Sequence, residues 1–392
     1  MSRNVYADHA AATRLRPEAL AAMIPYLEND FGNPLSVHSW GDAPREALEY
    51  ARGQVAQLIG ATPAEGYFTA NGSEANNAAV KGAALMNRNK GNHVVVSAIE
   101  HQSVLNPAAT LEKLGFEVTH VAVDRLGIVD PEAVAQALRD DTVLVSVMLA
   151  NNEIGTIQPI AEIAEVVHRT NAVLHTDAVA AVGKIPTDVR VLGADMLSLA
   201  GNQFYGPAGS GALYVKRGVR VMPLIEGGVQ ERGRRAGTEN VPAIVGLGVA
   251  AELSQQELGA AAVRLTAMRD HLIERLTTEN DHVILTGHPT QRLPHHASIC
   301  VEYVEGEAML LMLNMHGIAA SSGSTCTSKA LKASHVLTAL GIDIAVAQGS
   351  LVFTLGSDNT MEDIDYVADV LPPIVARLRA MSPLYPGNVR ER

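Results

Sequence analysis

The sequence predicts an α/β protein in which a large domain holds a mostly parallel sheet and a smaller domain is α+β. Short apolar, strand-like runs alternate with amphipathic, helix-like stretches through the first two-thirds of the 392 residues. After about residue 250 this alternation is replaced by a long helical run. A hydrophobic content of 47% is ample for a sizeable core.

The order of the elements follows from the same pattern. The expected strands of the large domain are residues 66–69, 94–98, 117–123, 143–149, 172–176 and 211–216. Helices are expected at 47–59, after the Asp130-Pro131 cap, at 160–167 and at 250–278. Strands near 297–304 and 351–355 then precede a last helix after Thr360, with Asp363 three residues on. We therefore expect a large domain at 16–255 and a small domain formed by 1–15 together with 256–392.

Composition excludes several classes of function. The net charge is −12 and the chain has no long basic run, so no direct nucleic-acid surface is expected. The longest apolar stretches, such as 143–150 and 244–251, are too short to span a bilayer. The first residues form no apolar signal region, which makes the cytoplasm the expected compartment.

The two cysteines lie in different surroundings. Two cysteines are too few for a disulfide scaffold. Cys300 lies in a run that alternates like a half-buried strand, which predicts a small core residue. Cys326 lies in a small, polar, glycine-containing stretch, residues 320–328, where a structural cysteine gains little. Cys326 is therefore the candidate for chemistry.

Two segments of the large domain are typical of ligand contacts at strand ends. Residues 68–77 run from a strand into a helix through a small-residue turn, and the free N–H groups near Gly72 and Ser73 suit a phosphate. Asp177 ends a strand, where open α/β sheets place ligand groups, although its spacing alone favours a helix N-cap. The surroundings of His101, taken alone, favour a loop histidine satisfied by its neighbours.

Seven ordered segments resemble the cysteine desulfurases, pyridoxal-phosphate (PLP) enzymes of the class V aminotransferase group. They are residues 32–38, 68–77, 99–103, 151–156, 193–214, 235–238 and 322–328. Together they span essentially the whole chain, and the resemblance implies the fold type I PLP-transferase fold with a sheet of the seven-stranded type. It also implies a homodimer, L-cysteine as substrate, and a scaffold or other sulfur-acceptor protein as partner.

The resemblance also implies roles for individual residues. In the family the turn at Gly72 and Ser73 holds the PLP phosphate, and the histidine at His101 stacks on the ring. A carboxylate at Asp177 pairs with the pyridinium nitrogen and strengthens the electron sink. The second asparagine of the Asn-Asn-Glu-Ile-Gly motif, here Asn152, contacts the cofactor oxygen and the substrate.

Two further roles extend beyond a single site. The threonine at Thr238 reaches the phosphate in the partner subunit, which is why the resemblance implies shared sites in a dimer. The loop cysteine at Cys326 is catalytic in the family and takes sulfur as a persulfide. Because thiolate is a soft ligand, Cys326 is also expected as a metal ligand that completes a shared iron–sulfur cluster.

Departures from the family pattern gather in the cofactor segment. Gln203 stands at the position of the lysine that binds PLP covalently, and a carboxamide nitrogen is not nucleophilic. Asn202 replaces a histidine, Ala200 a serine and Ala180 a glutamine. Ser357 stands where an arginine grips the substrate carboxylate.

We therefore expect a desulfurase-like protein of sulfur transfer or iron–sulfur assembly, with impaired or absent PLP turnover and PLP held non-covalently or not at all. Cys326 is its sulfur carrier or cluster ligand. One alternative is an active desulfurase that holds PLP non-covalently, with Gln203 among the residues around it. Another is a non-catalytic structural or regulatory remnant.

Overall fold

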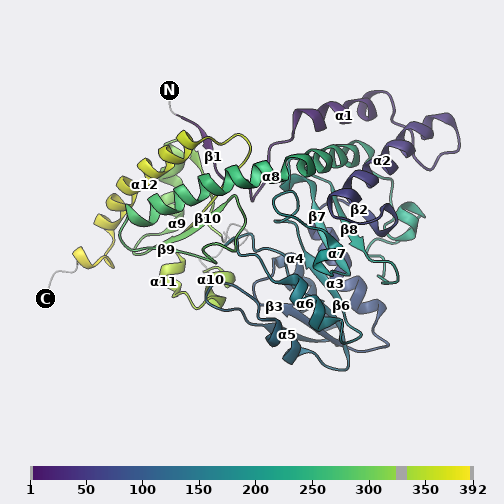
Figure 1. Ribbon diagram of the computed structural model, residues 1–392, viewed down its shortest axis with the longest axis horizontal. Helices are drawn as coiled ribbons and strands as arrows, with labels where there is room; N and C mark the ends of the chain where they lie inside the picture. Colours follow the sequence, from purple (N-terminus) through teal and green to yellow (C-terminus); the bar gives the residue numbers. More distant parts are fainter. Residues whose placement is uncertain (1–2, 324–332, 389–392) are drawn as a thin grey trace.

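The computed structural model describes residues 3–323 and 333–388, and its centre is a mostly parallel sheet. Its seven strands, in spatial order, are β2 (Gly66–Thr69), β8 (Gly211–Val215), β7 (Met196–Ala200), β6 (Val173–Asp177), β5 (Thr142–Ser146), β3 (His93–Ser97) and β4 (Glu117–Val121). β8 runs in the direction opposite to the other six strands, so its pairings with β2 and β7 are antiparallel. The predicted α/β class is confirmed, and Figure 1 shows the sheet between layers of helices.

Alternate side chains of the strands pack against helices on opposite faces of the sheet. Val94 and Val96 of β3 join one core with helices α3 and α4, whereas Val95 joins the other core with α2 and α6. The helices of this part are α2 (Asp42–Leu58), α3 (Gly72–Met86), α4 (Gln102–Lys113), α5 (Pro131–Ala137), α6 (Ile160–Val167) and α7 (Val189–Leu192). In the described part of the chain, no helix is both long and apolar enough to span a bilayer.

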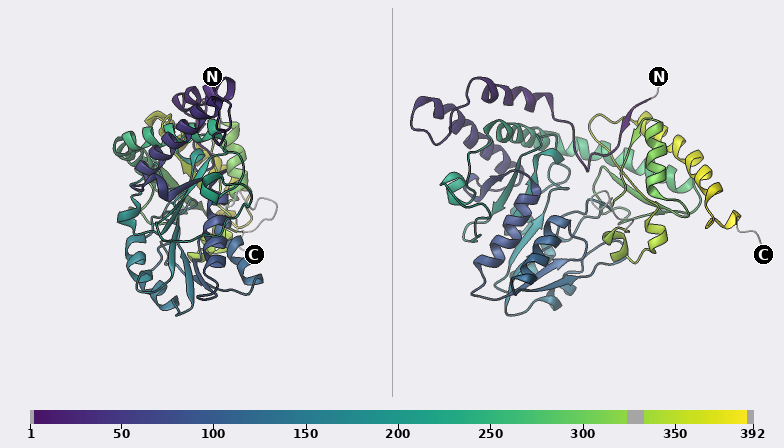
Figure 2. Two further views of the ribbon diagram at one scale, coloured as in Figure 1. Left: turned by 90° about the vertical axis from the view of Figure 1, so that its right-hand side faces the viewer. Right: turned by 180° about the vertical axis from the view of Figure 1, so that it is seen from behind.

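A second core lies around a small antiparallel sheet of order β12–β10–β9. Its elements are β9 (Val283–Leu285), β10 (His296–Val301), α9 (Gly306–Met315), β12 (Ser350–Thr354) and α12 (Met361–Met381). The short helices α10 (His335–Ala339) and α11 (Ile344–Ala347) pack instead in a separate cluster with Ile99, Met148 and Ile154. The N-terminal strand β1 (Val5–Tyr6) pairs in parallel with β11 (Ile318–Ala319), so the start of the chain lies beside its last third (Figure 2). The chain then continues into helix α1 (Pro17–Glu28).

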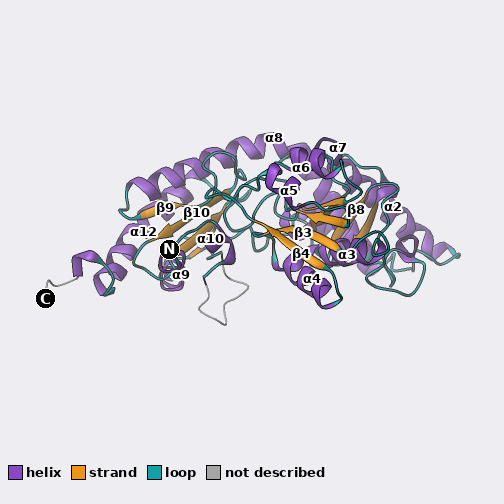
Figure 3. Ribbon diagram, turned by 90° about the horizontal axis from the view of Figure 1, so that it is seen from below, coloured by secondary structure: helices purple, strands orange, loops and turns teal. Residues whose placement is uncertain are grey.

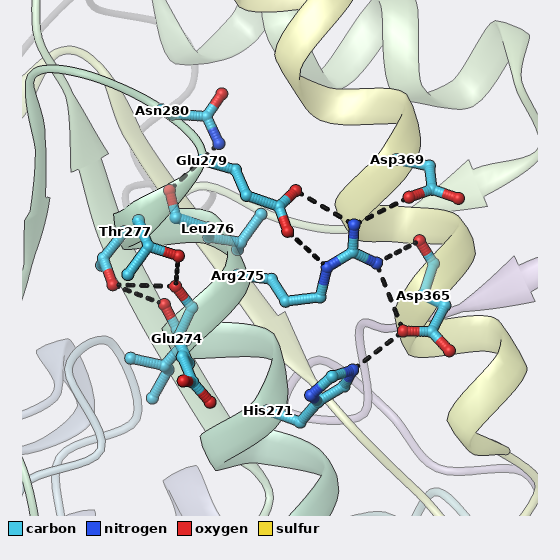
Figure 4. Close-up of polar contacts among 11 residues, drawn as sticks. His271, Glu274, Arg275, Leu276, Thr277, Glu279, Asn280, Asp365 and Asp369 are labelled. Atoms are coloured by element: carbon cyan, nitrogen blue, oxygen red, sulfur yellow. Dashed lines mark hydrogen bonds and ion pairs between the residues drawn. The ribbon is translucent and has the colours of Figure 1, made fainter.

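The longest helix, α8 (Val241–Thr278), extends along both groups of elements (Figure 3). Its first half packs on α1 and α2, and its second half packs on β9, β10 and α12. Near its C-terminus, Arg275 contacts Glu279, Asp365 and Asp369 (Figure 4). These carboxylates are substantially exposed, so the network fixes how α12 lies on α8 more than it adds stability. The predicted domain division at residues 255 and 256 falls inside this continuous helix.

Candidate active site

A cavity of about 690 Å³ opens at the carboxyl ends of the parallel strands. Asp177 at the end of β6 and Ala200 at the end of β7 lie on its wall, together with the N-termini of α3 and α4. The C-terminal part of the chain closes it with Val352 and with residues 321–323 and 333–336. The cavity therefore lies between the two groups of elements.

Most of the predicted site residues line this one cavity. Those that line it are Gly72, Ser73, His101, Asn152, Asp177 and Gln203. Thr238 is exposed and does not line it. Cys326 falls within 324–332, outside the described residues, but the described residues on both sides of that segment line the cavity.

A hydrogen-bonded chain joins the two groups that the sequence assigned to the cofactor ring. The Asn76 amide donates to Asp177 Oδ2 at 2.6 Å and also contacts Ser103 Oγ at 2.8 Å. The backbone N–H of Ser103 donates to His101 Nδ1, which leaves the proton of the neutral imidazole on Nε2. Burial raises the pKa of Asp177, and the nearby His101 lowers it. Asp177 Oδ1 also accepts a hydrogen bond from the N–H of Val179, as a capping residue would. Asp177 therefore caps the turn after β6 and lines the cavity at the same time.

The N-terminus of α3 is a site for an anionic group. Asn71 caps the helix by accepting from the N–H of Glu74, which leaves the N–H groups of Gly72 and Ser73 without a partner inside the helix. A Cβ on Gly72 would lie 2.6 Å from Val179 Cγ2, so only glycine allows this close approach. These N–H groups could receive a phosphate, and Asp177 and His101, the residues that the resemblance assigns to the cofactor ring, line the same cavity.

No lysine or arginine lines the cavity along the described residues. Gln203 lies on the wall, where its side-chain amide donates to the backbone oxygen of Ala10 at 2.9 Å. Asn202, Ala200 and Ala180 line it too, so these four departures from the family pattern share one site. Ser357 is not a lining residue; its N–H donates to the hydroxyl of Tyr205.

Three carboxyl groups of the cavity were not predicted as site residues. Asp8, Glu100 and Glu153 all line it, and burial raises the pKa of each. The pKa of Glu100 is about 8 and that of Glu153 about 7. Glu100 is next to His101 in the sequence, and Glu153 is next to Asn152. This adjacency to motif residues is the sequence signal that could have identified both carboxyl groups.

Replacing Glu100 by glutamine should flatten the pH dependence of stability. Glu100 accepts from Ser97 Oγ and from the N–H of Met148, and burial raises its pKa from 4.5 to about 8. The folded protein thus binds an extra proton between these values, so the wild type loses stability as the pH rises through this window. Glu100→Gln should gain roughly 2–5 kcal/mol relative to wild type between pH 5 and pH 9, measured by urea unfolding.

The matched control is Glu112→Gln, on the exposed face of α4. It should follow the wild-type curve at every pH. Parallel curves for Glu100→Gln and wild type would show that burial of this carboxyl is not linked to folding.

Comparisons with known proteins agree with this arrangement. The model of the family "Aminotransferase class-V" matches residues 5–367. The chain is 50% identical over 389 residues to a protein named cysteine desulfurase IscS from Methanosarcina thermophila, covering 99% of this chain and 96% of the relative. It is also 50% identical to cysteine desulfurase IscS 1 from Archaeoglobus fulgidus, covering 97% and 99%.

Solved structures show the same likeness. A NifS-like protein superposes with a TM-score of 0.89 at 36% identity, covering 96% of this chain and all of the other. A NifS-like protein from Rickettsia africae gives a TM-score of 0.84 at 30% identity and covers 95% of this chain. The chain therefore belongs to the aminotransferase class-V family, in its cysteine desulfurase group.

Proposed function

We propose that this chain serves sulfur transfer in iron–sulfur cluster assembly in the cytoplasm, as a homodimer that works with a scaffold or sulfur-acceptor protein. Cys326 is the sulfur carrier or a cluster ligand, and turnover of L-cysteine is impaired or absent. The role in sulfur transfer is supported by the relatives described above, which are named cysteine desulfurases. The loss of turnover rests on this chain's own residues.

The observation that supports the proposal is the set of side chains that line the cavity around Gln203. The Gln203 amide is held by Ala10, and no described lining residue is a lysine or arginine. A carboxamide cannot bind PLP covalently, and no described residue of this wall offers an amine to move a substrate proton. Ser357 likewise provides no cation for a substrate carboxylate.

The cavity still fits a non-covalently held PLP, which when bound supplies an electron sink. Asp177 would hold the ring nitrogen, His101 would cover the ring, and the N–H groups of Gly72 and Ser73 would hold the phosphate. Asn152 would contact a ring oxygen. Thr238 is exposed in the single chain, as expected of a residue that serves the partner's site. These groups would hold PLP in an active enzyme as well. The active-enzyme alternative therefore requires that another base take over the proton transfer of the missing lysine.

No covalent PLP adduct should form. One candidate amine among the described residues is Lys184, which is buried with its Nζ 4.6 Å from the centre of the Tyr205 ring and does not line the cavity. Burial lowers its pKa to about 8, but its position withholds it from a ligand. Borohydride treatment in the presence of PLP, followed by intact mass measurement, should leave the chain unmodified, and PLP should dialyse away. A stable adduct on Lys184 would contradict this.

The source of sulfur tests the proposed function. In assembly of a cluster on a cysteine-rich scaffold protein, wild type should work with sulfide and fail with L-cysteine plus PLP. Success with L-cysteine would favour the active enzyme instead. No effect of the chain under either condition would favour the structural or regulatory remnant.

A further inference from the structure

The backbone of residues 151–155, the turn that carries Asn152, is fixed by hydrogen bonds from a distant part of the chain. Arg292 Nη2 donates to the oxygen of Ile154 at 2.8 Å, and the N–H of Leu293 donates to the next carbonyl oxygen at 2.9 Å. Both donors lie more than a hundred residues later in the sequence, just before β10. The turn is therefore attached to the second group of elements as well as to the large sheet.

His296, the first residue of β10, holds the carbonyl group of Asn152 itself. The His296 Nε2 atom lies 2.9 Å from the Asn152 oxygen. Because a carbonyl oxygen only accepts hydrogen bonds, the proton of the imidazole is on Nε2. The ring is fully buried, and this burial lowers the pKa of His296 to about 3, so the ring is neutral at neutral pH.

The imidazole of His296 packs directly on Gly155. Gly155 has a φ of 76°, and a Cβ at this position would lie 2.9 Å from His296 Nδ1 and 3.1 Å from the His296 Cβ. Glycine is therefore required both for the backbone conformation and for the approach of the ring. This close packing sets where the Nε2–H group meets the Asn152 carbonyl.

The side chain of Asn152, in contrast to its backbone, is available to a ligand. It lines the cavity and is half-buried, and its amide has no hydrogen bond with any described residue. The amide can both donate and accept a hydrogen bond. A fixed backbone that carries a free amide lowers the entropy that a ligand contact would cost.

We infer that His296 is the positioning residue for Asn152, and that it orients the Asn152 amide in the cavity through the hydrogen bond to the carbonyl. His296 does not line the cavity, so it acts only through the turn. The inference rests on the proposed function in taking non-covalent PLP as the ligand that Asn152 contacts. It goes beyond that function because it assigns control of the cavity wall to a residue of the small antiparallel sheet.

Substitutions at His296 separate the hydrogen bond from the ring. His296→Gln places a side-chain N–H near the position of Nε2, whereas His296→Phe keeps a ring against Gly155 and removes the donor. In NMR spectra of the ligand-free chain, the side-chain N–H₂ signals of Asn152, assigned with Asn152→Ala, should be single in wild type and in His296→Gln. They should broaden or double in His296→Phe and in His296→Asn, whose amide is too short to reach the carbonyl. Single, unshifted signals in these two variants would overturn the inference.

Titration with PLP provides a second readout. His296→Phe should weaken PLP binding about three- to tenfold, and His296→Gln by less than about twofold. In an Asn152→Ala background, His296→Phe should cause no further loss, because its effect passes through Asn152. Losses that add up in the double variant would show that His296 acts on the fold as a whole and would reject its positioning role.

The matched control is His295→Phe, which changes the neighbouring buried imidazole and leaves the hydrogen bond to Asn152 in place. The Asn152 signals and the affinity for PLP should stay as in wild type, whatever stability this variant loses. Effects equal to those of His296→Phe would contradict the inference. If wild type binds no PLP, the cofactor site of the proposed function fails, and the Asn152 signals of the ligand-free chain still decide the role of His296.

Discussion

Cys326→Ser should abolish transfer of sulfur or cluster to the partner, down to the level seen without the chain, while dimerisation and melting temperature stay nearly unchanged. A thiolate is a soft ligand and a nucleophile, and a serine hydroxyl is neither at neutral pH. The measurement is scaffold-dependent cluster assembly with sulfide supplied directly. Sulfide enters a cluster at its own oxidation level, so this assay bypasses the missing cofactor chemistry and tests Cys326 as a cluster ligand, and the wild type should work under the same conditions. The role of Cys326 as a persulfide carrier is tested separately with a sulfane-sulfur donor such as polysulfide.

Cys300→Ser is the matched control and should behave in the opposite way. Cys300 is fully buried in β10, and burial raises the pKa of its thiol to about 12. A serine hydroxyl at this buried position is removed from water and has no hydrogen-bond partner that evolved for it. The variant should therefore lose about 1–3 kcal/mol of stability and keep the transfer of sulfur or cluster to the partner. If Cys326→Ser and wild type assemble clusters equally well, Cys326 is an inherited residue and the remnant alternative gains support.

The accuracy of the sequence predictions follows how local each signal is. The Thr360–Asp363 cap, which involves residues three apart, is present as a reciprocal capping box at the start of α12. β6, predicted from an apolar run, ends at the expected Asp177. β7 was missed as a strand because residues 196–200 were interpreted only as part of the cofactor segment.

Cys300 is the small core residue that the sequence predicts, but the expectation that its strand is half-buried was wrong. All of β10 is buried, because Ile299 and Val301 pack into the core around α9 and α12 while Cys300 packs with Ile99 and Met148, which follow strands β3 and β5. The strand thus lies between two cores. Its polar neighbours, such as Ser298, are satisfied by buried hydrogen bonds and do not mark a solvent-facing side.

The carboxyl groups of Glu100 and Asp8 could not be predicted from local sequence patterns, because contacts with distant residues place them in the cavity. Glu100 is buried by contacts with Ser97 and with Met148, which comes 48 residues later. Asp8 reaches the wall only because the arm pairs with strands more than 300 residues away. Motifs located many of the residues that line the cavity, but the number of carboxyl groups in the cavity depends on these long-range contacts.

Restoring the lysine alone should not restore the desulfurase reaction. Gln203→Lys supplies an amine to a wall whose described residues offer none, so PLP should become covalently attached and be retained on dialysis. The substrate carboxylate would still have no cation, because Ser357 remains and Asn202 is unchanged. Sulfide release from L-cysteine by this single variant should stay close to that of wild type.

The double variant Gln203→Lys with Ser357→Arg should release more sulfide than either single variant, by roughly tenfold or more, because a charge-assisted pair is worth about 1.5–3 kcal/mol. The control is Gln203→Met with Ser357→Arg, which provides the guanidinium without the amine and should stay inactive. Since the backbone at Ser357 is already held by the Tyr205 hydroxyl, the new side chain starts from a fixed position. Wild-type turnover equal to that of the double variant would reject the impaired-turnover proposal, because neither missing group would then be limiting.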